Sequence, residues 1–313
     1  MPVANQVQTP MASDQTAART RWLPYAALVL GIVALGFSAM FVRWAAAPGP
    51  VTGLYRMAIA TLVLTPLALA DRRRTGRGWP AGGLRLAVLG GLMLAMDLSL
   101  WNTSVNLTTA ANATLFANTA PLWVALASWL LFRERLSRRF WFGLLVTLSG
   151  AAAVLGADFL RHPTLSWGDG LALGAGLFYG GYYLITERAR RTLGAAPYVW
   201  VMGAACSAIL LVFSLALDMP LFGYPRQTYL AFVGLALVTQ VTGYLAVGYA
   251  LGHLPAAFVS PTMVGQPIVT AVLAIPLLGE LPTPTQVVGG LAVLAGIVLV
   301  HRSRNAASRP PAP

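Results

Sequence analysis

Ten long apolar runs follow one another along the 313 residues of this chain, separated by short polar stretches. A helix needs about 20 apolar residues to cross the hydrocarbon core of a bilayer, and backbone polar groups in lipid are satisfied only within helices or closed barrels. The sequence therefore predicts an all-α integral membrane protein with ten transmembrane helices. The runs cover residues 23–44, 51–70, 84–105, 110–132, 139–157, 167–186, 197–217, 228–250, 256–278 and 284–301.

Composition excludes a soluble protein, because 57% of the residues are hydrophobic and only 10% are charged. A soluble surface needs roughly 25–35% charged residues. The short connections leave no room for an extramembrane domain. Residues 1–21 and 302–313 are polar or Pro-rich, so we expect disordered cytoplasmic tails there. The polar start also argues against a cleavable signal peptide.

Positive charge is distributed unevenly between the two ends of the predicted helices. The net charge is +12, which in a soluble protein would suggest a nucleic-acid partner. Here 17 arginines lie in the tails and in the loops on one side, and three lie in the loops on the other. Cytoplasmic loops of membrane proteins carry the excess of Lys and Arg. We therefore expect both termini in the cytoplasm, the bilayer as the basic residues' partner, and no nucleic acid.

An internal duplication divides the chain into two halves, predicted at 22–157 and 158–301. The loop at 133–139 in the first half has four arginines, whereas its counterpart at 279–284 has none. The two loops should therefore face opposite sides of the membrane, which makes the halves inverted five-helix repeats. The matched positions, all 146 residues apart, are Pro121 and Pro267, Glu134 and Glu280, Gly143 and Gly289, and Gly150 and Gly296.

Pro121 and Pro267 lie near the middle of the fourth and ninth predicted helices. A proline removes a backbone donor and frees the carbonyl group four residues earlier. Paired breaks at corresponding positions of two repeats point to a transport site. We interpret both prolines as hinges. The alternative is a structural kink that a neighbouring Ser or Thr satisfies.

Polar and aromatic side chains inside the predicted helices indicate a central cavity. Such groups are costly in lipid and tend to face the interior of the bundle. Amide, hydroxyl and ring groups with few charges suit a small amphipathic solute, although each side chain could equally make an ordinary interhelix hydrogen bond. The candidate substrate-binding residues are Trp101, Asn102, Asn118, Tyr179, Tyr182, Tyr183, Gln240, Tyr244 and Gln266.

Two charged residues, Arg56 and Asp97, lie within the second and third predicted helices at similar depths from the outer side. We hypothesise that they pair with each other, or that Arg56 binds a substrate carboxylate while Asp97 binds an amine. A structural ion pair is the simpler interpretation.

Several kinds of chemistry find no support in the sequence. There is one cysteine, Cys206, and no cluster of histidines or carboxylates, so we expect no metal site. There is no GxxxxGK[ST] loop, so ATP should not drive the protein directly. We assign no catalytic residues and no cofactor.

The ten helices in two halves, the repeated Pro–Glu–Gly–Gly spacing and Arg56 early in the second helix resemble the drug/metabolite transporter superfamily, EamA type. This resemblance covers about residues 22–301. It implies a central cavity lined mainly by helices 1, 3, 4, 6, 8 and 9, and the export of small metabolites. The aromatic candidates favour a resemblance to the YddG-type exporters of aromatic and neutral amino acids.

We therefore expect a bacterial inner-membrane secondary transporter that exports aromatic and other neutral amino acids, or similar metabolites, by alternating access. The alternative within the class is a multidrug or nucleobase exporter. Alternatives of another class are a non-transporting membrane scaffold and a membrane-embedded enzyme, but an enzyme would need clustered titratable groups, and only Arg56 and Asp97 are candidates. The sequence indicates neither the energy source nor the oligomeric state.

Overall fold

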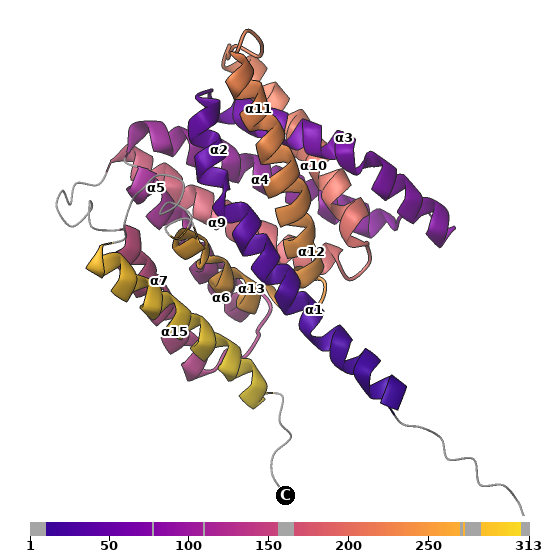
Figure 1. Cartoon of the computed structure of the whole chain (residues 1–313), viewed down its shortest axis with the longest axis vertical. Helices are drawn as coiled ribbons and strands as arrows, with labels where there is room; N and C mark the ends of the chain where they lie inside the picture. The colour runs from indigo at the N-terminus through magenta and orange to yellow at the C-terminus, as the bar shows by residue number, and fades with distance from the viewer. Residues whose placement is uncertain are drawn as a thin grey trace, which may run out of the picture.

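The computed structural model describes residues 11–76, 78–108, 110–155, 166–269, 272 and 283–307. All regular secondary structure in this part of the chain is helical (Figure 1). The first half contains α1 (Met11–Gly36), α2 (Ser38–Ala45), α3 (Gly49–Thr75), α4 (Ala81–Leu107), α5 (Ala110–Ala117), α6 (Ala120–Leu130) and α7 (Arg138–Leu155). The second half contains α9 (Trp167–Ala189), α10 (Ala195–Ala216), α11 (Arg226–Gly234), the π-helix η1 (Leu235–Tyr244), α12 (Leu245–Leu251), α13 (Ala256–Met263) and α15 (Pro284–Ala307).

Each of the ten predicted spans contains described helix, and four of them are divided: the ninth by a turn at 264–265, and three others into separately labelled helices. The first consists of α1 and α2, the fourth of α5 and α6, and the eighth of α11, η1 and α12. The ninth is described only as far as Val269 and at Val272. The chain is therefore an all-helical, multi-pass membrane protein.

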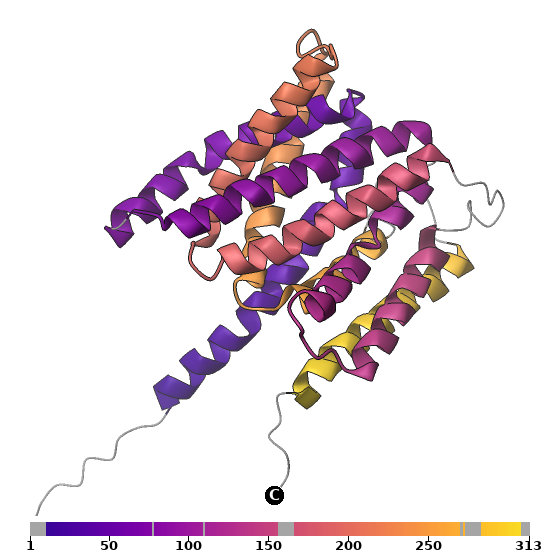
Figure 2. The same ribbon diagram turned by 180° about the vertical axis from the view of Figure 1, so that it is seen from behind.

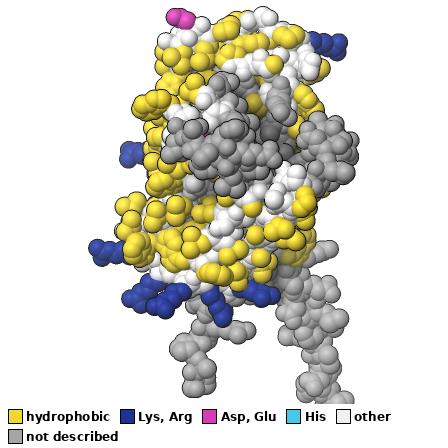
Figure 3. Space-filling model, turned by 90° about the vertical axis from the view of Figure 1, so that its left-hand side faces the viewer, with side chains coloured by type: hydrophobic (Ala, Val, Ile, Leu, Met, Phe, Trp, Pro, Cys, Tyr) yellow, Lys and Arg dark blue, Asp and Glu magenta, His cyan; other side chains and the backbone are white. Residues whose placement is uncertain are grey.

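Seven described helical segments are long and apolar enough to cross a membrane, judged by length and composition. Their outer faces are apolar, as lipid contact requires: Leu62 is 73% exposed and Leu291 is 63% exposed. Figure 3 shows hydrophobic side chains over most of one face, with several arginines gathered at its lower end. The seven segments are Trp22–Val42, Gly49–Arg74, Ala81–Ser104, Ala113–Leu130, Ala195–Ala216, Arg226–Leu251 and Pro284–Ser303.

The ends of the helical region differ from the expectation of disordered tails. Helix α1 begins at Met11, so residues 11–21 are helical, and α15 continues to Ala307. In both cases the helix extends beyond the apolar run, because polar residues can prolong a helix whose apolar part is already anchored. The start of α1 and the end of α15 lie at the same end of the molecule (Figures 1 and 2).

Helices α7 and α15 show how the two halves are related. A Cβ added at Gly143 would lie 3.0 Å from the carbonyl oxygen of Gly296, and one added at Gly150 would lie 2.7 Å from that of Gly289. Gly143 therefore packs against Gly296, which is the repeat counterpart of Gly150, and Gly150 packs against Gly289, which is the counterpart of Gly143. The two helices run antiparallel. This crosswise pairing is what a two-fold axis across the helices produces. Glycines permit such close approach of helices in lipid.

Other helix pairs repeat this relation. In α3 and α10, which occupy equivalent places in the two halves, Gly203 packs against Thr61 and Gly53 against Leu210. The indole Nε1 of Trp200 also donates to the Thr65 hydroxyl oxygen at 2.9 Å. Residue numbers rise along one helix as they fall along the other, so α3 and α10 are antiparallel. Corresponding helices of the two halves thus run in opposite directions, as the difference in loop charge predicted.

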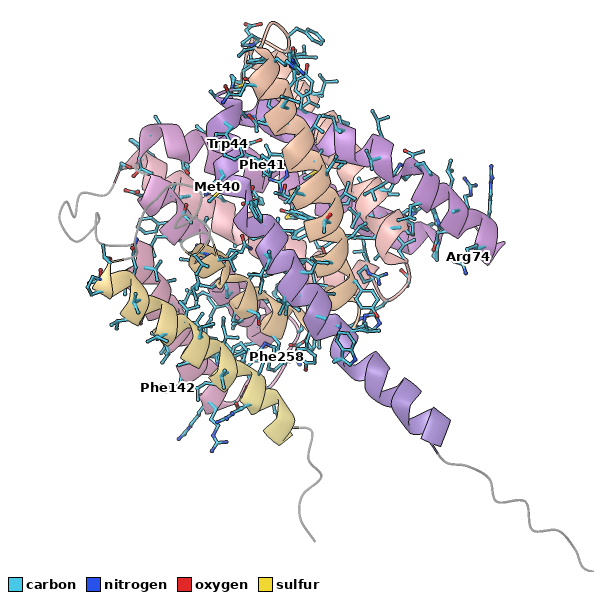
Figure 4. All side chains as sticks on the ribbon, viewed as in Figure 1. Met40, Phe41, Trp44, Arg74, Phe142 and Phe258 are labelled. Carbon is cyan, nitrogen blue, oxygen red and sulfur yellow. The ribbon has the colours of Figure 1, made fainter. Side chains whose placement is uncertain are left out.

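The outer end of the first span packs on the eighth. The hydroxyl group of Thr228 on α11 donates to the carbonyl oxygen of Ala45 at 2.8 Å. Phe41 and Trp44, which lie on α2 beside α11 in Figure 4, form an edge-to-face pair with ring centroids 5.5 Å apart. The phenyl ring of Phe41 fits against Gly234, where a Cβ would lie 2.3 Å from a ring carbon. These contacts place the start of η1 beside the break between α1 and α2.

Candidate functional site

Two corresponding helices are broken at equivalent positions. In the first half, α5 ends at Ala117 and α6 begins at Ala120, with residues 118–119 in a turn. In the second half, α13 ends at Met263, residues 264–265 form a turn and helix resumes at Gln266. The same 146-residue offset relates the two turns and the two prolines. The breaks expected at Pro121 and Pro267 are therefore present, and their role as hinges stays a prediction.

At the first break, side chains of the turn donate hydrogen bonds to backbone carbonyl groups at the end of α5. The Thr119 hydroxyl donates to the carbonyl oxygen of Phe116 at 2.6 Å, and the Asn118 side-chain nitrogen donates to that of Thr114 at 2.9 Å. Gly176 on α9 packs directly on the turn, since a Cβ there would lie 2.8 Å from the Thr119 hydroxyl oxygen. The amide nitrogen of Asn118, a predicted substrate contact, is thus engaged in holding the break.

Four tyrosines predicted to line the cavity come together at the interface of α9 and η1. Tyr179 stacks on Tyr182 with ring centroids 5.8 Å apart and an interplanar angle of 8°. Tyr183 lies 4.6 Å from Tyr179, and Tyr244 lies 5.7 Å from Tyr182, again between centroids. Tyr182 and Tyr183 are essentially fully buried. No described residue forms a hydrogen bond with the hydroxyl group of Tyr182 or Tyr183.

Arg56 reaches this cluster from α3. Its Nε donates to the side-chain oxygen of Gln240 at 3.0 Å, and its Nη1 donates to the Ser38 hydroxyl oxygen at 3.4 Å. The guanidinium carbon lies 5.4 Å from the centroid of the Tyr244 ring, within cation–π range. Arg56 is only 5% exposed, so a permanent positive charge is buried between the two halves.

The pairing of Arg56 with Asp97 stays a prediction, and in this structure Arg56 has other hydrogen-bond partners. Among the described residues the two side chains form no salt bridge, because the guanidinium group is directed to Gln240 on η1 instead. Asp97 on α4 is 9% exposed. It is close enough to Arg56, Tyr183 and Tyr244 to interact with them electrostatically. The two side chains thus share one site without touching.

The π-helix η1 carries two of the side chains that reach Arg56. Hydrogen bonds from residue i to i+5 widen each turn, and such segments occur often at functional sites. In this wide helix Gln240 and Tyr244 both contact Arg56. The Thr239 hydroxyl donates to the carbonyl oxygen of Leu235 at 2.6 Å, which satisfies a backbone acceptor inside the altered helix. The sequence analysis did not predict a π-helix here.

Cys206 on α10 and Ser38, at the start of α2, belong to the same neighbourhood, and the sequence analysis did not select them. Cys206 is fully buried and interacts electrostatically with Arg56 and Asp97. Ser38 follows the break at Phe37 that divides the first span. A lone cysteine in an apolar run does not indicate a functional role. A serine inside a predicted span could have been included among the polar candidates.

Three other predicted substrate contacts are not brought into the cluster. Asn102 donates from its side-chain nitrogen to the carbonyl oxygen of Gly49 at 3.1 Å, which joins α4 to the start of α3. Trp101 and Gln266 are partly buried, and neither makes a ring contact or a side-chain hydrogen bond with the tyrosines, Arg56 or Gln240. The described residues hold no group of three or more His, Cys, Asp or Glu that could bind a metal ion.

The end of α9 contacts α12 and the start of α13 at the loop side that is rich in arginine. The Glu187 carboxylate accepts the backbone N–H of Ala256, the first residue of α13, at 2.8 Å and forms a 3.0 Å salt bridge with Arg191. Arg190 donates to the carbonyl oxygens of Gly248 on α12 and of Leu193. This end of the bundle is therefore tied together across α9, α12 and α13.

Comparison with known proteins agrees with this architecture. The chain matches the EamA-like transporter family twice, over residues 22–156 and 166–302. It superimposes on a solved crystal structure with a TM-score of 0.74 at 19% identity, covering 91% of this chain and 99% of that one. At that identity the similarity shows the fold alone.

Two curated relatives align over most of their length. One, from Streptantibioticus cattleyicolor, is named "Probable terminal-alkyne amino-acid exporter" and is 28% identical over 83% of this chain and 90% of its own length. The other, "Uncharacterized transporter YdfC" from Bacillus subtilis, is 24% identical over 87% of this chain and 92% of its own. The family is one of transporters and not of enzymes. With both halves matched, the chain belongs to the EamA-like transporter family of the drug/metabolite transporter superfamily.

Proposed function

We propose that this protein is a secondary transporter of the bacterial inner membrane that exports amino acids, aromatic and other neutral ones above all, or similar small metabolites. The observation that carries the proposal is the cluster formed by Arg56, Gln240 and the four tyrosines, with Asp97 beside it. Its members come from α3 and α4 of one half and from α9 and η1 of the other. A site shared between inverted repeats is where substrates of such transporters bind.

The chemistry of the cluster suits an amino acid with an apolar or aromatic side chain. Tyrosine rings offer apolar faces with hydroxyl groups at their edges, and the Arg56 guanidinium group and the Asp97 carboxyl group could each bind one of the two charged groups of an amino acid. The relative named as an exporter of a terminal-alkyne amino acid supports this substrate class. We propose export rather than uptake because that relative is named an exporter.

Alternating access would require the two halves to close in turn around the cluster. The equivalent breaks before Pro121 and Pro267 are suitable bending points, because helix hydrogen bonding is already interrupted there. We place both termini on the cytoplasmic side, as the charge distribution indicates. The contacts of Glu187 and Arg190 would then close the cytoplasmic end in the present conformation.

Release of amino acids by cells tests this function. Cells expressing the protein and fed a phenylalanine-containing dipeptide should release phenylalanine faster than cells expressing equal amounts of an Arg56→Ala variant in the membrane. Equal release by both would contradict the proposal.

A second candidate function, export of planar drugs or nucleobases, is favoured by the parallel Tyr179 and Tyr182 rings, which resemble a stacking surface. The buried Arg56 works against planar cations, because like charges repel strongly where water is excluded. This candidate predicts that expression raises resistance to planar toxic compounds and leaves amino-acid release unchanged.

A further inference from the structure

The orientation of the Gln240 side chain follows from its partner. Arginine can only donate hydrogen bonds, so the atom that Arg56 Nε contacts at 3.0 Å must be the amide oxygen. The amide nitrogen, with two N–H groups, therefore occupies the other position. Gln240 is 1% exposed, and no described residue accepts a hydrogen bond from this nitrogen. An oriented, buried donor without an acceptor would be satisfied by a ligand that accepts a hydrogen bond.

Arg56 has no charged hydrogen-bond partner among the described residues. Its guanidinium group has five N–H donors, and the structure shows an oxygen acceptor for Nε and another for Nη1. Neither acceptor is charged, and Arg56 makes no salt bridge with a described residue. A buried charge without a hydrogen-bonded counter-ion is strongly destabilising. A carboxylate is the ligand that best satisfies Arg56 and the Gln240 nitrogen together, because it accepts at both oxygens and carries the opposite charge.

Asp97 adds a carboxyl group to the site. Its carboxylate receives no hydrogen bond from a described residue, although it lies within electrostatic range of Arg56, Tyr183 and Tyr244. The carboxylate and ammonium groups of an α-amino acid are joined through a single carbon atom. A zwitterion could therefore place its carboxylate at Arg56 and its ammonium group at the Asp97 carboxyl group.

We propose that Arg56 and the Gln240 amide nitrogen bind the carboxylate of the substrate and that Asp97 binds its ammonium group, so that the substrate must be a zwitterionic α-amino acid with its side chain against the tyrosines. The inference rests on the proposed function and names the substrate class and the specificity-determining residue. Gln240 is the determinant because its amide nitrogen adds two directional donors to those of Arg56.

The test compares three ligands that share one ring: phenylalanine, phenethylamine, which lacks the carboxylate, and 3-phenylpropionate, which lacks the ammonium group. Each is added to the purified, detergent-solubilised protein, and the shift of its thermal unfolding midpoint is titrated. Sites built around hydrogen bonds to a substrate group reject analogues that lack it. Phenylalanine should raise the unfolding midpoint at concentrations about a hundredfold or more below those that either analogue requires. Equal potency of phenethylamine would overturn the carboxylate assignment, and equal potency of 3-phenylpropionate would overturn the role of Asp97.

Two variants address Gln240 directly. Gln240→Leu removes the donors, and Gln240→Glu places a negative charge beside Arg56 that repels the substrate carboxylate. Both variants should weaken the binding of phenylalanine about tenfold or more. Both should leave the binding of phenethylamine unchanged. Gln227→Leu, the same chemical change at an exposed position on α11, is the matched control and should behave as wild type.

The ligand series on the wild-type protein gives an answer even if both Gln240 variants fail to fold. Phenylalanine binding that persists in a folded Gln240→Glu protein would overturn the inference. Stabilisation by planar drugs alone, with none by any α-amino acid, would overturn the inference and the proposed substrate together. Equal binding of phenylalanine and phenethylamine would overturn the inference alone.

Discussion

Replacement of Gly296 by alanine tests the crosswise packing of α7 and α15. The added Cβ would lie 2.6 Å from the backbone nitrogen of Thr147 and 2.7 Å from the carbonyl oxygen of Gly143. Ordinary contact begins near 3.4 Å, so the helices would have to separate by about 0.7–0.8 Å. Backbone atoms cannot rotate away as a side chain can. A gap of this size forfeits a quarter to a half of each dispersion contact along the interface.

The expected magnitude combines two opposing effects. Overpacking costs about 1–3 kcal/mol, and contact with backbone on the facing helix puts this site near the upper end. Alanine regains up to about 1 kcal/mol over glycine through its helix propensity. The net expectation is a loss of about 2 kcal/mol. Gly290→Ala on the same helix has room, since its nearest neighbour would be a carbon of Ile268 at 3.8 Å, so it should be neutral or slightly stabilising.

The assay is the thermal unfolding midpoint of the two purified variants in the same detergent. A midpoint for Gly296→Ala about 4 °C or more below that of Gly290→Ala is expected, at about 2 °C or more per kcal/mol. Equal midpoints would refute the close antiparallel packing, and with it the two-fold relation between the halves that the four glycines define.

Three further substitutions test other parts of the account. Pro121→Ala should slow transport more than it lowers the amount of protein in the membrane, because it restores a donor at a bending point; equal loss of both would mean a purely structural proline. Glu187→Ala removes the acceptor for the first N–H of α13 and should reduce the free energy of unfolding by about 0.5–2 kcal/mol, seen as a lower unfolding midpoint. Asp97→Asn should reduce phenylalanine transport about tenfold or more, since a buried charge contact is lost, and unchanged transport with an unchanged pH dependence would remove Asp97 from the mechanism.

The fold was largely predictable because lipid imposes few solutions. Apolar length predicts spans, and arginine in loops predicts orientation, so the ten segments and their inversion followed without any knowledge of contacts. The offset that pairs Pro121 with Pro267 also predicted two equivalent breaks. The extent of α1 and α15 was less predictable, because a hydropathy pattern does not show how far polar residues continue a helix.

The site was predictable only as a set of side chains. The three tyrosines of α9 share a face by spacing alone, and their proximity to one another was expected. Their meeting with Tyr244 and the pairing of Arg56 with Gln240 are contacts between different helices, and spacing within one helix does not predict which helices meet. Depth in the membrane suggested Asp97 as the partner of Arg56, but depth does not determine the direction in which a side chain points.

Uptake of labelled phenylalanine, tryptophan, threonine and methionine into proteoliposomes, with and without a pH gradient, tests the central claim most directly. We predict saturable uptake of phenylalanine and of at least one other of these amino acids, which unlabelled phenylalanine inhibits, and its response to the gradient separates ion coupling from facilitated diffusion. Sealed vesicles that contain folded protein and take up none of the four would contradict the account of this protein as an amino-acid carrier.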